Sequence, residues 1–423
     1  MTTIETVHLD DLAEPRFSAD IDAIRSVMAD MGADLRLDPD AMIEAARAQE
    51  GLDDLGGDGW REGYGVLVSA LQDEAGLSPQ GVLSLHTQIV QFLANRLRLA
   101  ALVAEHPEIL DVEIAAPIVI AGLPRTGTTH LHNLLAADPA LRTLPYWESL
   151  EPIPPASERG TDHDPAGRMA RTAVGVDFLD AALPHFKRMH EMTVEHVHEE
   201  IGLLAMSFST MFFETLANMP SYREWYRATS QRAAYRELRT YLQAMTWLRG
   251  GERWVLKSPQ HLEQFGVLLD VFPDATVVVT HRDPVSVTAS MATMVTYLRR
   301  TQVDHPDPVA TGGYWFDRVE DLLTSCLDDR EVLAPDRSID VRFADFMGDM
   351  TGTVAQIYEV AGQPLTQAAR AAHEGYLAGH GRDRFGRIDY RLEDFGITVD
   401  ACRARFAPYV ERFAVQQESA ITR

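Results

Sequence analysis

The stretch IVIAGLPRTGTTHLHNLL, residues 118–135, decides the fold of this chain. Its first residues are apolar and mostly β-branched, a pattern that predicts a strand buried on both faces. Gly122, four further residues and Gly127 follow, and the apolar residues after Thr129 have helical spacing. A strand, a glycine loop and a helix in this order form an anion-binding turn. Glycine lets the backbone approach the anion, and the first N–H groups of the helix point at it.

The loop lacks the lysine that a nucleotide hydrolase needs, because Thr128 stands in that place. Arg125 supplies a positive charge instead, and its planar guanidinium suits the edge of a phosphate or sulfate. The candidate anion site is therefore the backbone of residues 125–129 with the hydroxyls of Thr126, Thr128 and Thr129. The glycine spacing alone is equally consistent with a tight strand–helix turn that carries a surface arginine.

Three later runs repeat the pattern of an apolar strand followed by a helix: RWVLKS (253–258), ATVVVTHRD (275–283) and SIDVRF (338–343). Strands that alternate with helices predict a parallel, doubly wound sheet with right-handed crossovers. We therefore expect an α/β fold of the three-layer P-loop type. Its central parallel sheet has about four or five strands flanked by helices, and helical additions lie at both ends. Ligands of such sheets bind at the carboxyl ends of the strands.

Composition limits the partners and the compartment. The 423 residues include 38 basic and 63 acidic side chains, a net charge of −25, which argues against nucleic acid or an anionic membrane as the main partner. Cys326 and Cys402 have no zinc-site spacing, and so few cysteines suggest a reducing compartment. The N-terminus lacks a secretion signal, and no apolar run is long enough to span a membrane. We expect a cytoplasmic protein; its oligomeric state, homo-oligomer included, stays open.

A second basic site follows the 275–283 strand. Arg282 comes directly after the strand, and Ser290 lies eight residues on, two turns into the next predicted helix. A lone arginine at such a place usually makes a surface salt bridge, but its pairing with the glycine loop favours a second phosphate site.

Together, the blocks GLPRTGTT, WVLKSP and HRDPVSVTAS resemble the sulfotransferases that use 3′-phosphoadenosine 5′-phosphosulfate (PAPS), most closely the bacterial branch with PRTGTT loops. The resemblance covers roughly residues 117–395. It implies that PAPS is the co-substrate. It also implies that the 5′-phosphosulfate is bound by Arg125, Thr126, Gly127, Thr128 and Thr129, and that the 3′-phosphate is bound by Arg282 and Ser290.

Two further features bear on the donor. The region GHGRDRFGRIDYRLEDFGI, residues 379–397, is similar to the segment that closes over the donor in this family, which adds Arg382, Arg384 and Gly386 on the 3′-phosphate side. Many members carry a tryptophan after the double threonine that stacks on adenine, whereas this chain has His130. Either the imidazole stacks in its place, or His130 is a polar residue of the helix start and adenine is held elsewhere.

Sulfuryl transfer moves SO3 from a phosphate oxygen to an acceptor oxygen or nitrogen by in-line displacement, and positioning dominates as in phosphoryl transfer. Cations and backbone N–H groups can stabilise the leaving phosphate, so we expect no metal requirement. In the family a lysine at the end of such a strand bridges donor and leaving oxygen, the place of Lys257. The alternative for Lys257 is an ion pair with a surface carboxylate.

The acceptor hydroxyl must lose a proton, and two bases compete. Glu148 lies at the distance from the loop where related sulfotransferases place a catalytic glutamate. His261 follows Lys257 by four residues, whereas another branch of the family places its histidine closer to the lysine. We slightly favour Glu148. The histidines and glutamates of MHEMTVEHVHEEIGLL (189–204) are spread around a predicted helix start. We therefore expect a polar helix start, with lining of the acceptor pocket as one role for it, rather than a metal site.

We expect a helical extension over residues 1–115 and a catalytic domain over 116–423, with a helical insert at 164–248 that covers the site of a small-molecule acceptor. Seven large side chains of this insert either line a pocket for an apolar alcohol, phenol or lipid or pack in the core: Phe208, Met211, Phe212, Phe213, Tyr222, Trp225 and Tyr226. The alternative functions are a nucleotide kinase or NTPase on the same fold, which would need the loop lysine and a magnesium-binding aspartate, and an inactive nucleotide-binding protein.

Overall fold

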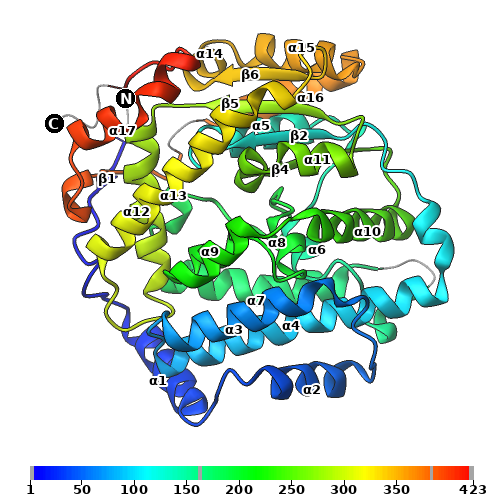
Figure 1. The fold of residues 1–423 in the computed structure, drawn as a ribbon, viewed down its shortest axis with the longest axis vertical. Helices are drawn as coiled ribbons and strands as arrows, with labels where there is room; N and C mark the ends of the chain where they lie inside the picture. The colour runs from blue at the N-terminus through cyan, green and yellow to red at the C-terminus, as the bar shows by residue number, and fades with distance from the viewer. Residues whose placement is uncertain (1–3, 161–163, 382–383, 419–423) are drawn as a thin grey trace.

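A computed structural model describes residues 4–160, 164–381 and 384–418. Its centre is a parallel five-stranded sheet in the order β3-β4-β2-β5-β6, which lies in the upper half of Figure 1. The strands are β2 (Ile118–Gly122), β3 (Leu141–Arg142), β4 (Arg253–Ser258), β5 (Thr276–His281) and β6 (Ser338–Arg342). The predicted α/β fold is confirmed.

The central strand β2 is buried along its whole length because helices cover both faces of the sheet. Its alternate side chains enter two different cores, Ile118 and Ile120 on one face and Val119 and Ala121 on the other. The register places Ile120 opposite Lys257 of β4 and Val278 of β5. The carboxyl ends of these three strands therefore lie side by side.

The first face packs against α5 (Thr128–Ala136), α14 (Phe343–Gly348), α15 (Met350–Ala361) and α16 (Gln367–Gly379). The second face packs against α11 (Phe265–Val271), α12 (Pro284–Arg299), α13 (Pro308–Asp329) and α17 (Val399–Arg412). Each face of the sheet thus has its own helical layer, as a doubly wound topology requires.

The N-terminal helices α1 (Ala19–Gly32), α2 (Pro39–Glu50), α3 (Arg61–Asp73) and α4 (Pro79–Glu105) lie at the bottom of Figure 1, far from β6. The longest of these helices is α4, and the hydroxyl of Ser78 accepts a hydrogen bond from the N–H of Gly81 as its cap. Arg98 of α4 is buried between the carboxylates of Glu50 and Glu151. This pairing ties the N-terminal helices to the segment that precedes the insert.

The insert contributes α7 (Ala166–Ala182), α8 (Ile201–Ala205), α9 (Pro220–Ala228) and α10 (Arg232–Arg249), and α8–α10 lie between the sheet and the N-terminal helices in Figure 1. Five of the seven large side chains singled out in the insert are fully buried in the main core: Phe208, Met211, Phe213, Tyr222 and Tyr226. Phe212 and Trp225 are partly buried and pack against the same core. Core packing is therefore the correct one of the two alternatives for these residues.

The two ends of the chain meet on one side of the molecule. β1 (Thr6–Val7) pairs in parallel with β7 (Arg387–Ile388), and both termini lie at the upper left of Figure 1. Across the residues that the structure describes, no helix is both long and apolar enough to cross a membrane.

The sheet core sets the stability of the fold. Ile120→Ala removes a side chain that is fully buried between two layers, so we expect the free energy of unfolding to fall by about 2–5 kcal/mol. Urea denaturation followed by circular dichroism measures this loss. Val174→Ala on α7 is the control, because Val174 is 71% exposed and its change should stay within about 0.5 kcal/mol. Equal effects of the two substitutions would contradict the assignment of Ile120 to the core.

Candidate active site

The glycine loop joins β2 to α5 and is built for close backbone approach. A side chain on Gly122 would place its Cβ 1.9 Å from Oγ1 of Thr280, so only glycine lets β2 pass β5 at this point. Arg125 and Gly127 both have positive φ, 71° and 87°. A non-glycine residue held in the left-handed region stores strain of about 1–3 kcal/mol, as is common at ligand sites. The first turn of α5 offers N–H groups that have no partner within the helix.

Four of the predicted donor-binding residues lie together. Nε of Arg125 donates a hydrogen bond of 3.0 Å to Oγ of Ser290, two turns into α12. Nη1 of Arg282 donates to the backbone carbonyl of Arg125 at 2.6 Å. Thr126 is buried, and its hydroxyl lies 2.7 Å from that of Thr280. The ends of β2 and β5 therefore bring two guanidinium groups to one place.

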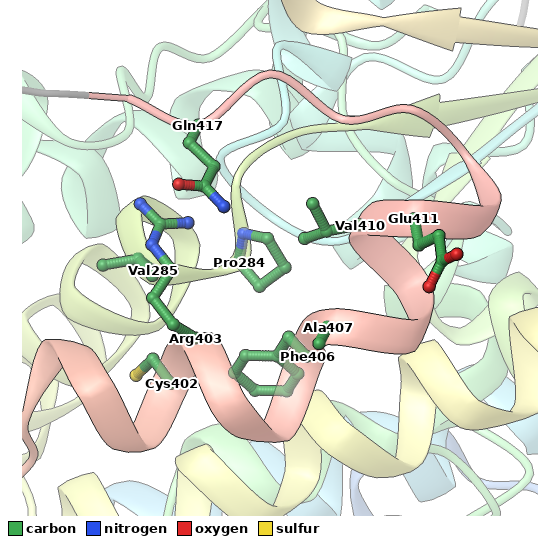
Figure 2. A pocket seen from close by; sticks show the side chains of 9 residues that line it. All are labelled: Pro284, Val285, Cys402, Arg403, Phe406, Ala407, Val410, Glu411 and Gln417. Atoms are coloured by element: carbon green, nitrogen blue, oxygen red, sulfur yellow. The ribbon is translucent and has the colours of Figure 1, made fainter.

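A carboxylate from the C-terminal tail lies against this basic site. Glu418 accepts hydrogen bonds from Nε and Nη2 of Arg282 at 2.6 and 2.8 Å, and its N–H donates to Asp283 at 2.7 Å. Figure 2 shows the tail residue Gln417 beside Pro284 and Arg403, where α17 packs on the start of α12. Glu418 thus presents two oxygens to the guanidinium edge that a phosphate would contact.

Lys257 ends β4, next to the loop. It is one of only two lysines among the 38 basic residues of the sequence, and its side chain is buried. Nζ forms an ion pair with Glu199, and the backbone N–H of Lys257 donates to Oε2 of Glu200 at 2.7 Å. The alternative for Lys257 is an ion pair with a surface carboxylate. Lys257 does pair with a carboxylate, that of Glu199, but the pair lies beside the glycine loop and is not a surface contact.

The two side chains predicted as bases are both held by internal partners. Glu148 is buried and forms salt bridges with Arg142 at 2.6 Å and Arg249 at 3.0 Å. His261 is fully buried between the hydroxyl of Tyr235, 2.7 Å from Nδ1, and the carboxylate of Glu200. These partners use the lone pairs that a general base would offer to a substrate.

Glu200 connects the lysine strand to His261. Burial raises the pKa of Glu200, but the hydrogen bond and charge of His261 outweigh it and hold the pKa below its usual range. This buried carboxylate is therefore ionised at neutral pH and fixes both the end of β4 and the His261 ring.

Three histidines gather next to Lys257. The ligand nitrogens of His190, His196 and His198 lie within 4.8 Å of one another, so the prediction that they are spread around a helix start is wrong. They precede α8 on an extended segment, and an antiparallel bridge joins Val197 to Pro145. Alternation along an extended segment puts His196 and His198 on the same side, which helical spacing would not do.

The histidine cluster is neutral at physiological pH. Burial and the charge of Lys257 lower the pKa of His196 to about 4. Burial, the neighbouring histidines and Lys257 hold the pKa of His190 and of His198 well below the usual range, and Arg125 contributes for His190. These interactions place the cluster beside the loop arginine and the strand lysine.

His130 begins α5 with its ring 5.8 Å from Phe346 and 5.7 Å from Tyr376, between centroids. Its Nε2 lies 3.3 Å from Sδ of Met350. The imidazole thus belongs to a partly buried aromatic group in which Tyr376 also stacks on His380 at 4.1 Å. Several flat rings are therefore available where the family places its tryptophan.

The C-terminal segment reaches the insert. Arg384 pairs with Glu191, next to the histidine segment. Gly386 has a φ of 90°, and a Cβ there would lie 2.8 Å from the backbone oxygen of Glu5, so the close approach requires glycine. Arg382 lies outside the described residues. This segment does pack near the site, but Arg384 faces an acidic residue of the insert.

An apolar cavity of about 480 Å³ adjoins the histidine cluster. Its walls come from α1, α4, α6 (Tyr146–Leu150), α7 and the loop after α12. Tyr146 lines the cavity, and its ring lies 4.8 Å from that of His198. A cavity of this size suits a small organic molecule, and Tyr146 lies between it and His198.

A family model described as the sulfotransferase family matches residues 117–367, more than half of the chain. The chain belongs to the sulfotransferase family. The match begins one residue before β2 and includes the loop, Lys257 and Arg282, so it spans the site just described.

The sulfotransferase is also similar to two solved structures. Sulfotransferase STF9 from Mycobacterium avium is 28% identical, with a TM-score of 0.80 over 90% of this chain and 97% of that one. Sulfotransferase STF1 from Mycobacterium tuberculosis H37Rv is 31% identical, with a TM-score of 0.74 over 87% and 98%. Both matches extend beyond the family core into the helical additions.

One similar curated protein is the omega-hydroxy-beta-dihydromenaquinone-9 sulfotransferase Stf3 of Mycobacterium tuberculosis. It is 26% identical over 300 residues, which are 67% of this chain and 70% of that protein. These relatives establish that the chain is a sulfotransferase enzyme.

Sequence reasoning missed the roles of Glu199, Glu200 and the histidine cluster in this sulfotransferase. The signal was present in the run HVHEE (196–200), in which four of the five residues are polar and which directly precedes an apolar helix. It pointed to the site only once β4 and the insert were placed side by side.

The neutral histidines make stability depend on pH. The folded pKa of His196 lies at about 4 and the unfolded value near 6.5, so the unfolded chain binds the proton first as pH falls. The neutral His196 ring therefore contributes fully to the free energy of unfolding above about pH 6.5. This contribution, up to roughly 3 kcal/mol, is lost as the pH falls from about 6.5 to about 4. His196→Gln should therefore flatten the dependence of unfolding free energy on pH in this window. His305→Gln, an exposed histidine, serves as control, and an unchanged slope in His196→Gln would contradict the burial of a neutral ring.

Proposed function

We propose that this sulfotransferase moves a sulfuryl group from PAPS to a hydroxyl of an apolar small-molecule acceptor. The observation that carries the proposal is the convergence of Arg125, Lys257 and Arg282 at the ends of three adjacent strands, with Ser290 of α12 hydrogen-bonded to Arg125. The chain has a net charge of −25, yet these cations gather where an anionic donor would bind. A donor with a 5′-phosphosulfate and a separate 3′-phosphate needs two cation sites of this kind.

In this proposal the glycine loop binds the 5′-phosphosulfate through Arg125, its neighbouring N–H groups and the hydroxyls of Thr128 and Thr129. Arg282 and Ser290 bind the 3′-phosphate, and Glu418 leaves the guanidinium when the donor enters. Adenine stacks within the aromatic group of His130 and Tyr376. Arg384 contributes on the 3′-phosphate side once it exchanges Glu191 for a phosphate.

Lys257 stabilises the charge that develops on the leaving phosphate oxygen. The donor's sulfate displaces Glu199 from Nζ, so the lysine stays paired throughout. Its place at the end of a buried strand fixes Nζ before the reaction, and such preorganisation is the main electrostatic contribution to catalysis. The mechanism requires no metal step.

The acceptor lies in the apolar cavity between the N-terminal helices and α7. Stf3 acts, by its name, on a hydroxyl at the end of an apolar chain, and a cavity of this kind suits a similar terminal alcohol. Helices α1 and α4 are thus parts of the acceptor site, although they precede the proposed catalytic domain at 116–423.

A nucleotide kinase or NTPase remains the alternative on the same fold. Thr128 in the lysine position and Arg282 after β5, where a magnesium-binding aspartate would be needed, disfavour it. The donor-binding experiment separates the two.

Donor binding is tested by thermal shift with adenosine 3′,5′-bisphosphate. Wild-type protein should be stabilised by the bisphosphate and not by ATP with magnesium. Arg282→Ala should weaken binding by about 10- to 100-fold, because it loses charged hydrogen bonds to the 3′-phosphate. Glu418→Gln should strengthen it by about two- to fivefold, because the competing carboxylate is neutralised.

Arg342→Ala is the matched control, since Arg342 ends the next strand, β6, and pairs only with exposed Asp345 among the described residues. An unmoved melting temperature at saturating bisphosphate would contradict PAPS as the donor. Weaker binding in Glu418→Gln would contradict the displacement of the tail.

Sulfuryl transfer itself is tested with labelled PAPS and a long-chain primary alcohol, with the product detected by the mass of added sulfate. Lys257→Met should lower turnover by about 100- to 1,000-fold while bisphosphate binding persists. Lys187→Met is the control, because the second lysine of the chain is exposed. Near wild-type turnover in Lys257→Met would remove Lys257 from the mechanism.

A further inference from the structure

The base of the reaction is not supplied by the two residues that sequence spacing favours. Glu148 is paired with two arginines, and His261 has both ring nitrogens occupied by Tyr235 and Glu200. An alcohol acceptor must nevertheless lose its proton as the new O–S bond forms. The histidine cluster beside Lys257 is the nearest set of neutral proton acceptors.

We propose that His198 is the general base, and that it receives the hydroxyl proton of an acceptor whose apolar part lies in the cavity next to Tyr146. The inference rests on the proposed function and assigns a residue to its proton-transfer step.

Geometry selects His198 within the cluster. Its ring contacts Tyr146, a wall of the cavity, whereas His190 lies at the donor end, where the carbonyl of Met189 accepts a hydrogen bond from Arg125. Nδ1 of His198 and Nε2 of His196 are both buried, and no hydrogen bond from the described part of the chain reaches either nitrogen. The contact with Tyr146 therefore distinguishes His198 from His196. An unpaired buried nitrogen is costly, and an acceptor hydroxyl would satisfy it.

Backbone hydrogen bonds hold the His198 segment against Tyr146, which lines the cavity. Its N–H donates to the carbonyl of Leu144 at 2.7 Å, and the N–H of Tyr146 donates to the carbonyl of His196 at 2.8 Å. The histidine segment and the cavity wall therefore form one short antiparallel pair. A base fixed in this way holds its position without a further partner on the ring.

Donor binding raises the proton affinity of His198. The groups that act on it are His196, Lys257 and His132, and with burial they keep its imidazole neutral. The phosphosulfate brings negative charge to Lys257 and offsets the repulsion between that lysine and an imidazolium. The base is thus neutral in the free enzyme and becomes stronger once the donor is in place.

The proposed step makes one O–S bond, breaks another and transfers one proton. The hydroxyl proton moves to a nitrogen of His198, and the freed oxygen lone pair forms the O–S bond. The bond between sulfur and the 5′-phosphate oxygen breaks, and its electron pair stays on that oxygen beside Lys257. The products are the sulfate ester and adenosine 3′,5′-bisphosphate, and the imidazolium releases its proton to solvent.

The test compares acceptors that differ in their need for a base. His198→Gln should lower kcat by about 100- to 10,000-fold with a long-chain primary alcohol. With 4-nitrophenol, which ionises near neutral pH without help, the loss should stay below about tenfold. Lys257→Met should slow both acceptors alike, because it acts on the leaving group. Exogenous imidazole should restore part of the alcohol activity of His198→Ala.

Several outcomes would overturn the assignment. Equal losses with the two acceptors, or no loss with either, would show that His198 is not the base. If wild-type protein binds bisphosphate but uses neither acceptor, the apolar alcohol is wrong; if it does not bind bisphosphate, the proposed function itself fails. A stoichiometric metal ion that depends on His198, with activity lost on chelation, would make the cluster a metal centre instead.

Folding is checked by circular dichroism and by bisphosphate binding, both of which His198→Gln should retain. His305→Gln, exposed and distant in the sequence, should match wild type with both acceptors. A His198→Gln variant that fails to bind bisphosphate would assign the residue a structural role and not a catalytic one.

Discussion

A buried positive charge must keep a negative partner, and the architecture of this site follows from that constraint. Lys257 has a side chain that is 3% exposed, and an unpaired ammonium in such a place would cost several kcal/mol. Glu199 supplies the partner from the insert. In the proposed function the donor takes the place of Glu199 by bringing its own negative charge, so the constraint that pairs Lys257 in the fold would also select an anionic ligand.

Arg282 follows the same rule at the other end of the site. Its guanidinium donates to the Arg125 carbonyl and to the Glu418 carboxylate, and in the proposed function a phosphate replaces only the carboxylate. In this proposal Nη1 of Arg282 holds the glycine loop, while the edge formed by Nε and Nη2 exchanges Glu418 for a phosphate. Acidic side chains that carry the chain's large negative charge can therefore serve as internal counter-ions at a site for an anionic donor.

The donor half of the site could be predicted from the sequence because its parts are short contiguous blocks. One block is a buried strand followed by a glycine loop, and another is an arginine followed eight residues later by a serine. Each block indicates the same local structure whatever the rest of the sequence is. The edge strand β3 was missed because a two-residue strand leaves no periodic pattern. The histidine segment was misplaced because helical and extended backbones present the same residues in different groupings, and only the bridge between Val197 and Pro145 decides between them.

The acceptor half could not be predicted, for a different physical reason. Its cavity is formed by segments as distant as Phe17, Gln80, Phe178 and Leu298, none of which carries a motif. The large aromatics of the insert fill the core, so the cavity depends on where α4 and α7 leave space between them. Under the proposed function, substitutions in the N-terminal helices would therefore change the choice of acceptor without altering the donor loop, so acceptor specificity and sulfuryl transfer would depend on different parts of the chain.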